Sequence, residues 1–125
     1  MREQMKQTVE AAQDTICEAL EALDDARFEE DRWEREGGGG GRSRVLQGGS
    51  VFEKAGVNSS VVYGTLSEEA AAAMRARRGK ELGTSRQFFA TGVSLVFHPR
   101  NPWVPTVHAN FRYFELGEGD AWWFG

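Results

Sequence analysis

The sequence has very little cysteine and no long hydrophobic run. Cys17 is the single cysteine among 125 residues, so neither a disulfide framework nor a paired-cysteine metal site is expected. No stretch approaches the roughly 18 consecutive apolar residues that a membrane span requires, and the N-terminus has no apolar segment typical of a secretion signal. We therefore expect a soluble, cytoplasmic protein in a reducing compartment.

An excess of positive charge is also missing. The 15 Lys and Arg residues are outnumbered by 19 Asp and Glu, which gives a formal net charge of −4. This balance does not favour a nucleic-acid-binding protein. The one basic cluster, RARRGK at residues 75–80, follows an alanine run and is typical of a helix C-terminus, where cations complement the helix dipole. A length of 125 residues corresponds to one domain or part of one.

Apolar residues recur at spacings of three and four near the N-terminus. This stripe consists of Met5, Val9, Ala12, Ile16, Ala19, Leu20 and Leu23. Acidic residues, among them Asp14, occupy the other face and are expected to point to water. The pattern predicts an amphipathic helix over about residues 3–30. Cys17 lies beside the stripe and is expected to be a small core residue rather than a nucleophile.

Five consecutive glycines occupy residues 37–41. They predict a glycine-rich loop, because glycine loses more backbone freedom on ordering than any other residue. Two interpretations stay open: a flexible linker, or an ordered turn whose backbone amides approach an anionic ligand, with Arg42 and Arg44 adding charge. A phosphate-binding P-loop matches poorly, because GxxxxGK[ST] would need Gly at Glu36 and Lys at Arg42.

From Val45 onward, short stretches rich in β-branched and aromatic residues are broken by Gly or Pro, which is typical of strands. They read VLQGGSVFEKAG, NSSVVYG, QFFATGVSLVF, TVHANFRYFEL and AWWFG. One helix over about residues 67–78 interrupts them, with Ser67 as its N-cap and Gly79 at its end. We therefore predict an α+β fold, a large and mostly antiparallel β-sheet covered by helices.

Both histidines fall within the stretch GVSLVFHPRNPWVPTVHANFR. Its three prolines exclude a helix there, and the short connection between two strands predicts an antiparallel pair. Alternation places Ser94 and His98 on one face of the first strand, and His108, Asn110 and Arg112 on one face of the second. If these two faces coincide, the five side chains form one polar patch.

Two interpretations of this patch compete. It is either the solvated side of a half-buried sheet or a functional pocket. The patch has no Lys or Glu, and it groups two imidazoles, a carboxamide and a guanidinium, which suit holding a carboxylate and moving a proton. A metal site has less support, because two histidines are too few and their spacing matches no tight ligand motif.

Two long segments and one short one, taken together and in order, closely resemble the N-terminal part of the oxygen-dependent coproporphyrinogen III oxidase family. They are RWEREGGGGGRSRVLQGGSVFEKAGVNSSVVYG, GVSLVFHPRNPWVPTVHANFRYFE and WWFG. The resemblance implies oxidative decarboxylation of two propionates of coproporphyrinogen III to vinyl groups, which gives protoporphyrinogen IX in haem biosynthesis. It further implies O₂ as the oxidant, no organic cofactor, and a homodimer for the full-length protein. Residues 1–125 would be the N-terminal part of a single domain with the family fold, a large antiparallel sheet between helices.

The resemblance also implies roles for individual residues. Ser94 corresponds to a substrate-binding serine, and the run Asn110, Phe111 and Arg112 corresponds to one that contacts the tetrapyrrole. His108 corresponds to the proposed proton donor. His98 and His108 would be ligands of the divalent metal cation associated with bacterial members. Phe111, which alternation places on the opposite face, would act through its backbone.

Family chains are more than twice as long as this one, and their later segments carry further substrate contacts, two more histidines and the main dimer element. The resemblance therefore implies an N-terminal fragment that is inactive alone. A non-catalytic tetrapyrrole-binding module is the alternative function, and a metal-binding sheet protein is a third.

Overall fold

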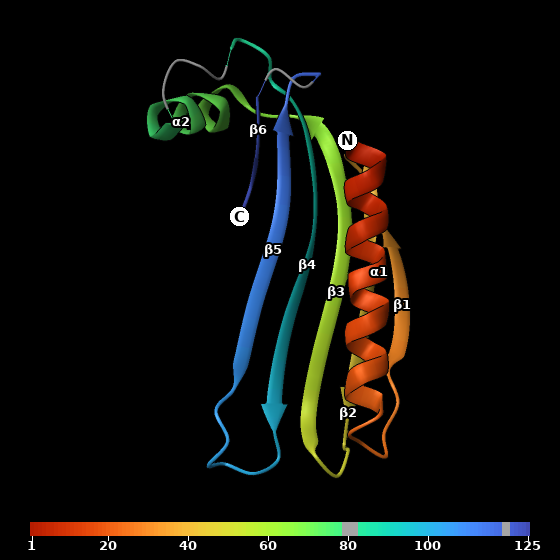
Figure 1. Cartoon of the computed structure of the whole chain (residues 1–125). Helices are drawn as coiled ribbons and strands as arrows, with labels where there is room; N and C mark the ends of the chain where they lie inside the picture. The colour runs from red at the N-terminus through yellow and green to blue at the C-terminus, as the bar shows by residue number, and fades with distance from the viewer. Residues whose placement is uncertain (79–82, 119–120) are drawn as a thin grey trace.

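The computed structural model describes residues 1–78, 83–118 and 121–125 (Figure 1). Along the chain the elements are α1 (Arg2–Glu21), β1 (Glu29–Glu34), β2 (Gly39–Gln47), β3 (Phe52–Thr65), α2 (Glu68–Arg78), β4 (Gln87–Pro99), β5 (Val107–Leu116) and β6 (Ala121–Phe124). The six strands form one sheet in the order of the sequence, and every neighbouring pair is antiparallel. The α+β class and the antiparallel sheet agree with the prediction. No helix of the described residues is long and apolar enough to cross a membrane.

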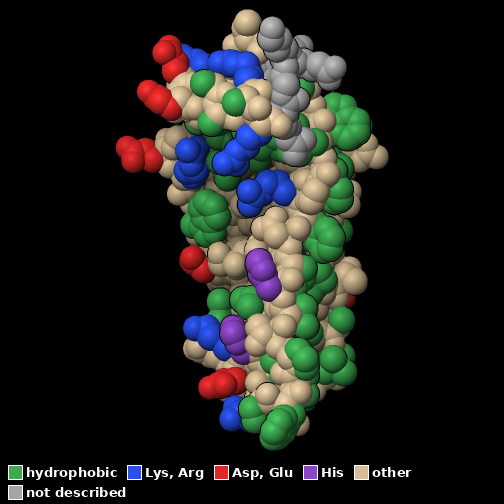
Figure 2. All heavy atoms as spheres, turned by 90° about the vertical axis from the view of Figure 1, so that its left-hand side faces the viewer, with side chains coloured by type: hydrophobic (Ala, Val, Ile, Leu, Met, Phe, Trp, Pro, Cys, Tyr) green, Lys and Arg blue, Asp and Glu red, His purple; other side chains and the backbone are tan. Residues whose placement is uncertain are grey.

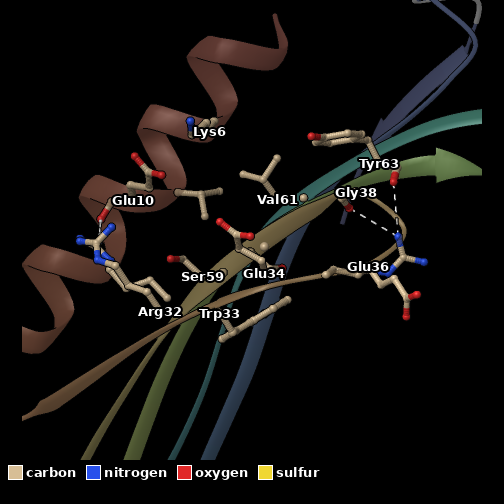
Figure 3. A pocket seen from close by; sticks show the side chains of 17 residues that line it. Lys6, Glu10, Arg32, Trp33, Glu34, Glu36, Gly38, Ser59, Val61 and Tyr63 are labelled. Atoms are coloured by element: carbon tan, nitrogen blue, oxygen red, sulfur yellow. Dashed lines mark hydrogen bonds between the residues drawn. The ribbon is translucent and has the colours of Figure 1, made fainter.

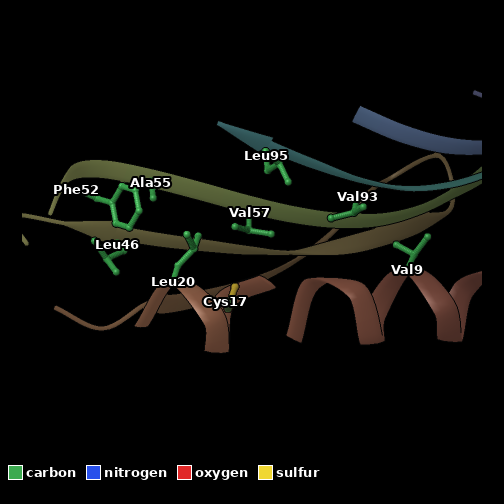
Figure 4. Packing of buried hydrophobic residues seen from close by; sticks show 9 residues of the cluster. All are labelled: Val9, Cys17, Leu20, Leu46, Phe52, Ala55, Val57, Val93 and Leu95. Atoms are coloured by element: carbon green, nitrogen blue, oxygen red, sulfur yellow. The ribbon is translucent and has the colours of Figure 1, made fainter. Parts of the chain in front are cut away.

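Helix α1 lies along one face of the sheet and buries the hydrophobic core against it (Figures 1 and 4). The core comprises Val9, Cys17, Leu20, Leu46, Phe52, Ala55, Val57, Val93 and Leu95. Cys17 is only 4% exposed, and burial raises the pKa of its thiol. Since the thiolate is the reactive form, this cysteine packs as a core residue, as predicted.

A buried amide in the middle of the apolar stripe anchors α1 to the sheet. The Gln13 side chain is fully buried and its Nε2 donates to the carbonyls of Arg42 and Val57 at 2.7 and 2.8 Å. Its Oε1 accepts from Arg42 Nε at 2.6 Å and from the Ser59 hydroxyl at 2.7 Å. Each polar atom of Gln13 is therefore paired, as a buried polar group requires.

The predicted helix over residues 3–30 is wrong at its C-terminal end, because α1 ends at Glu21 and Glu29–Glu34 form strand β1. The Asp24 carboxylate accepts hydrogen bonds from the backbone N–H groups of Ala26 at 3.1 Å and Phe52 at 2.8 Å. Aspartate that bonds nearby backbone groups competes with helix continuation. Strand β1 is exposed along its whole length, so no apolar alternation marked it in the sequence.

The glycine tract is ordered, so the flexible-linker interpretation is wrong. Residues 36–38 make the turn between β1 and β2, and the last three glycines already belong to β2. Gly38 and Gly39 have φ angles of 108° and 94°, which residues with a Cβ rarely adopt. The Trp33 indole lies over Gly41, where a Cβ would overlap the ring. The loop predicted over residues 37–41 is therefore shorter than expected.

The two arginines that follow the glycines bind α1 and β1 rather than a free anion. Asp14 forms ion pairs of 2.8 Å with both Arg42 and Arg44, and Arg44 Nε donates to Glu30 at 2.8 Å. The expectation that Asp14 points only to water is wrong for the same reason. These contacts leave the Arg42 and Arg44 charges compensated, which removes the argument for an anion-binding turn.

The inserted helix is α2, and the Ser67 hydroxyl caps it by accepting from the backbone N–H of Ala70 at 3.2 Å. Its predicted end at Gly79, with the last part of the basic cluster, lies outside the described residues. Figure 1 shows α2 near one end of the sheet, close to β6, while α1 runs along the strands. In the described part of the chain, the expected helical cover is thus present along one face only.

Candidate functional site

The register of β4 and β5 places predicted site residues beside one another. Ser94 lies directly opposite Asn110, and Gly92 lies opposite Arg112. Directly opposed residues of an antiparallel pair share one face, with Cβ atoms about 4.5–5.5 Å apart. The polar faces of the two strands therefore coincide, which was the condition for a single patch.

The two histidines lie on this same face. His108 is opposite Val96, and His98 is two residues farther along β4. This makes them diagonal neighbours, at a spacing of about 7–8 Å in an antiparallel sheet. The Thr106 hydroxyl lies 3.5 Å from Nδ1 of His98. Figure 2 shows both imidazoles uncovered on one face of the molecule.

Phe111 is the one predicted site residue whose side chain lies on the other face. It is opposite Val93, which packs in the core against α1. Its ring is 51% exposed, so α1 does not cover it. The expected role of the Phe111 backbone stays a prediction, because backbone groups of a paired strand lie in the plane of the ladder.

The patch differs from the α1 face in how its polar groups are used. On the α1 face, polar side chains bond to one another or to backbone, as when the Tyr113 hydroxyl donates to Glu115 at 2.8 Å. Within residues 1–78, 83–118 and 121–125, the side chains of Ser94, His108, Asn110 and Arg112 form no hydrogen bond or ion pair. Ser94 is half-buried and the other three are exposed. These groups do not hold the fold together and are available to a ligand.

Strand β3 adds polar residues to the same face that the sequence analysis did not single out. Asn58 lies opposite Ser94, Ser60 opposite Gly92, and Lys54 opposite His98. Alternation within β3 shows that these three share a face, but the pairing of β3 with β4 across the intervening α2 was not visible in the sequence. Lys54 and Arg112 supply the cations of this part of the sheet.

Aromatic rings border the polar patch at one end. Phe114 stacks on Phe88 with centroids 5.8 Å apart and on Trp123 with centroids 4.5 Å apart. Phe114 lies two residues beyond Arg112 on β5 and hence on the same face. Between the rings and the histidines, β4 carries only Ser94 and the bare Gly92 near the centre of this face, with Asn110 and Arg112 beside them on β5. This flat floor with cations and an aromatic border suits a planar ligand that bears carboxylates.

The histidine pair does not make a complete metal centre within this chain. Diagonal imidazoles can approach one cation, but the described residues contain no group of three or more His, Cys, Asp or Glu that would hold one. Protein zinc sites use three or four protein ligands. We therefore assign no chemical step to a metal here.

A separate hollow of about 1040 Å³ lies on the α1 face, between α1 and strands β1 to β3 (Figure 3). Its charged residues carry both signs, with Lys6 and Arg32 beside Glu10 and Glu34. This mixture favours no ligand charge. None of the predicted site residues lines the hollow, so the candidate chemistry lies on the opposite face.

Comparison with known proteins shows the family to which this chain belongs. Residues 4–125 match the family model of coproporphyrinogen III oxidase, so the chain belongs to this family. Over 132 residues it is 54% identical both to the mitochondrial oxygen-dependent coproporphyrinogen-III oxidase of Homo sapiens and to the oxygen-dependent coproporphyrinogen-III oxidase of Drosophila melanogaster. Over 133 residues it is 49% identical to coproporphyrinogen-III oxidase 1, chloroplastic, of Arabidopsis thaliana.

Each match covers the whole chain but only 29% of the human relative and 34% of the other two. The chain thus spans about a third of the length of these relatives. The names of the human and plant relatives place those proteins in the mitochondrion and the chloroplast. They do not support our expectation of a simply cytoplasmic protein.

Proposed function

We propose that this chain supplies the substrate-binding floor of an oxygen-dependent coproporphyrinogen III oxidase. The observation that carries the proposal is the shared, uncovered face of Ser94, His108, Asn110 and Arg112, in a chain that belongs to this family. We further propose that residues 1–125 form part of a single domain with the family fold. The substrate, coproporphyrinogen III, would lie over β3 to β5.

The overall chemistry requires only a carboxylate-bearing substrate and O₂. When a propionate becomes a vinyl group, the carboxylate leaves as CO₂ and the side-chain carbon bonded to the pyrrole ring loses a hydride equivalent. O₂ accepts the hydride, and with one proton it becomes hydrogen peroxide. O₂ is thus a co-substrate, and we propose no organic cofactor for this reaction.

Each residue of the patch has a role that its chemistry permits. The Arg112 guanidinium holds a substrate carboxylate through charge-assisted hydrogen bonds. Ser94 and Asn110 donate hydrogen bonds to the polar edge of the ligand, and the Phe111 backbone completes that contact. His108 transfers a proton, because imidazole is the side chain that titrates near neutral pH. We also propose that His98 and His108 are the two ligands this chain offers to a divalent cation, and that the full-length protein is a homodimer.

A chimaeric enzyme tests this proposal. Residues 1–125 replace the matching segment of the human relative, which is 54% identical over 132 residues. The chimaera is supplied with coproporphyrinogen III and O₂, and CO₂ release is measured. We expect O₂-dependent CO₂ release and protoporphyrinogen IX. Binding of coproporphyrin III without CO₂ release would instead favour the alternative of a non-catalytic tetrapyrrole-binding module.

The isolated chain provides the second measurement. We expect 125 residues alone to bind coproporphyrin III weakly, because the patch is an open face, and to release no CO₂. Turnover by the isolated chain would show that the residues named here contain the whole chemistry. Failure of both the chain and the chimaera to bind the porphyrin would reject the proposed function.

A further inference from the structure

One row of directly opposed polar side chains crosses the histidine face. Asn110 on β5 lies opposite Ser94 on β4, and Ser94 lies opposite Asn58 on β3. Since neighbouring strands are about 4.8 Å apart, the row extends about 10 Å across the centre of the sheet. Two of these three residues belong to the proposed binding floor, while Asn58 has no role assigned to it.

The row continues to Ser43 on β2 and to the exposed Asp31 on the edge strand β1. Ser43 lies opposite Asn58, and the Ser43 hydroxyl accepts a hydrogen bond of 3.1 Å from the Trp33 indole nitrogen. The Asn58 side chain is exposed, and within the described part of the chain it has no hydrogen-bond partner. Asn58 is thus the last unpaired N–H donor of the row, because Trp33 already engages Ser43 and the Asp31 carboxylate on β1 would repel an anionic ligand.

The carboxamide of Asn58 suits the proposed substrate for two reasons. It offers two N–H donors for a carboxylate and one oxygen that accepts from a pyrrole N–H. Gly56, two residues away on the same face of β3, carries no side chain that would lift a flat ligand away from the strand. A Cβ there would have only the Val96 side chain within 4 Å, at 3.8 Å.

We propose that Asn58 is a further substrate-binding residue, which extends the floor made by Ser94 and Asn110 onto β3. This inference rests on the proposed function, since it concerns the same face and the same ligand class. The floor is then three strands wide rather than the two that the histidine hairpin provides. Asn58 binds and orients the tetrapyrrole and takes no part in proton transfer.

Selective labelling of asparagine tests the contact directly. The chain contains three asparagines, Asn58, Asn101 and Asn110, so ¹⁵N-asparagine labelling gives three pairs of side-chain N–H signals. These are followed by NMR during titration with coproporphyrin III, whose ring current shifts nearby protons. We expect the Asn58 and Asn110 signals to move with the same midpoint. Asn101 serves as the internal control, because its side-chain oxygen accepts from the Trp103 backbone in the β4–β5 loop. The Asn101 side-chain signals are expected not to shift.

Variants of the full 125-residue chain measure the consequence for affinity. Asn58→Leu removes the hydrogen bonds and is expected to weaken coproporphyrin III binding about three- to tenfold. Asn58→Asp adds a carboxylate to the floor and is expected to weaken binding further, with a partial recovery in high salt. Gln47→Leu is the matched control, because Gln47 is an exposed amide of the same face that lies opposite Lys54, outside the row. The affinity of the Gln47→Leu chain for coproporphyrin III is expected to equal that of the wild-type chain.

The outcomes separate this inference from the function on which it rests. If the wild-type chain binds the porphyrin and the Asn58 variants bind equally well, Asn58 is not a binding residue while the proposed function stands. The same conclusion follows if the Asn110 signals shift during the titration and the Asn58 signals do not. If neither the wild-type chain nor the chimaera binds, both proposals are rejected.

Discussion

Ser94 of β4 lies directly opposite Asn110 of β5 in the antiparallel ladder, on the face of the sheet that α1 leaves uncovered. Both side chains belong to one hairpin, closed by the proline-containing loop that joins the two strands. A hairpin sets the distance between such residues through its backbone hydrogen bonds, so the site needs no distant element to bring these two groups together. On the same face, Arg112 and Lys54 lie on either side of this pair along the strands.

Substitution of Arg112 is expected to weaken substrate binding. A hydrogen bond to a charged group contributes about 1.5–3 kcal/mol, so Arg112→Ala should raise the Kd for coproporphyrin III about tenfold or more. Fluorescence titration measures the Kd. Arg32→Ala is the control, because Arg32 is exposed on β1 and pairs with Glu30 at 2.8 Å, away from the histidine face. An unchanged Kd for Arg112→Ala would exclude its role as a carboxylate anchor.

Substitution of His108 is expected to affect turnover rather than folding. A general acid or base typically contributes about 10²–10⁴-fold in rate, so His108→Ala should lower kcat of the chimaera by about that factor. The imidazole is exposed and has no side-chain partner in the described structure, so the melting temperature should stay the same. If activity persisted and the melting temperature fell, His108 would be a structural residue.

The histidine pair is expected to bind a divalent cation only while both imidazoles are present. Calorimetric titration of the chain with Zn²⁺ should show weak binding that either His98→Ala or His108→Ala removes. Two ligands alone hold such an ion less firmly than the three or four of an established zinc site. The expectation fails if each single variant binds Zn²⁺ as the wild-type chain does.

Asp24 is expected to make stability depend on pH in acid. Its side chain is 9% exposed, and although burial opposes ionisation, hydrogen bonds from the backbone N–H groups of Phe52, Ala26 and Ser50 hold its pKa well below the usual value. A depressed pKa in the folded state stabilises the fold above the unfolded value of about 3.9. This stability should be lost as the pH falls below about 4 toward the folded pKa.

Asp24→Asn should therefore lower the free energy of unfolding at pH 7 by about 1.5–3 kcal/mol, since it replaces charge-assisted bonds with neutral ones. Urea denaturation at several pH values measures both effects, and the variant should lose less stability in acid than the wild-type chain. Asp31→Asn is the control, because Asp31 is exposed on β1 and its side chain has no partner among the described residues. If the two substitutions lowered the free energy of unfolding equally, the backbone hydrogen bonds of Asp24 would not account for the loss.

Several features of the fold were predictable because they depend on local periodicity. The three-and-four spacing that contains Val9 and Leu20 predicted part of the buried face of α1, although Ala19 and Leu23 of that stripe are exposed. The period of two placed Ser94 with His98 and His108 with Asn110. The resemblance to the family rested on segments that the comparison then matched over residues 4–125. Each of these features follows from residues near one another in the chain.

By itself, then, the sequence determined the amphipathic helix, the antiparallel hairpin and the side-chain alternation that groups the histidines, because helix and strand periods are properties of short segments. Only the tertiary structure decided where α1 ends, since Asp24 leaves the helix pattern to bind the backbone of the β2–β3 turn. It likewise decided that the last three glycines of the tract belong to β2, with the Trp33 indole over Gly41, and that Asn58 lies beside Ser94. These features depend on contacts between residues that come together only in the folded chain, as Asp24 meets Phe52 and Asn58 meets Ser94. The backbone hydrogen bonds that pair two strands are the same whatever the side chains, so the sequence of one strand does not reveal its partner.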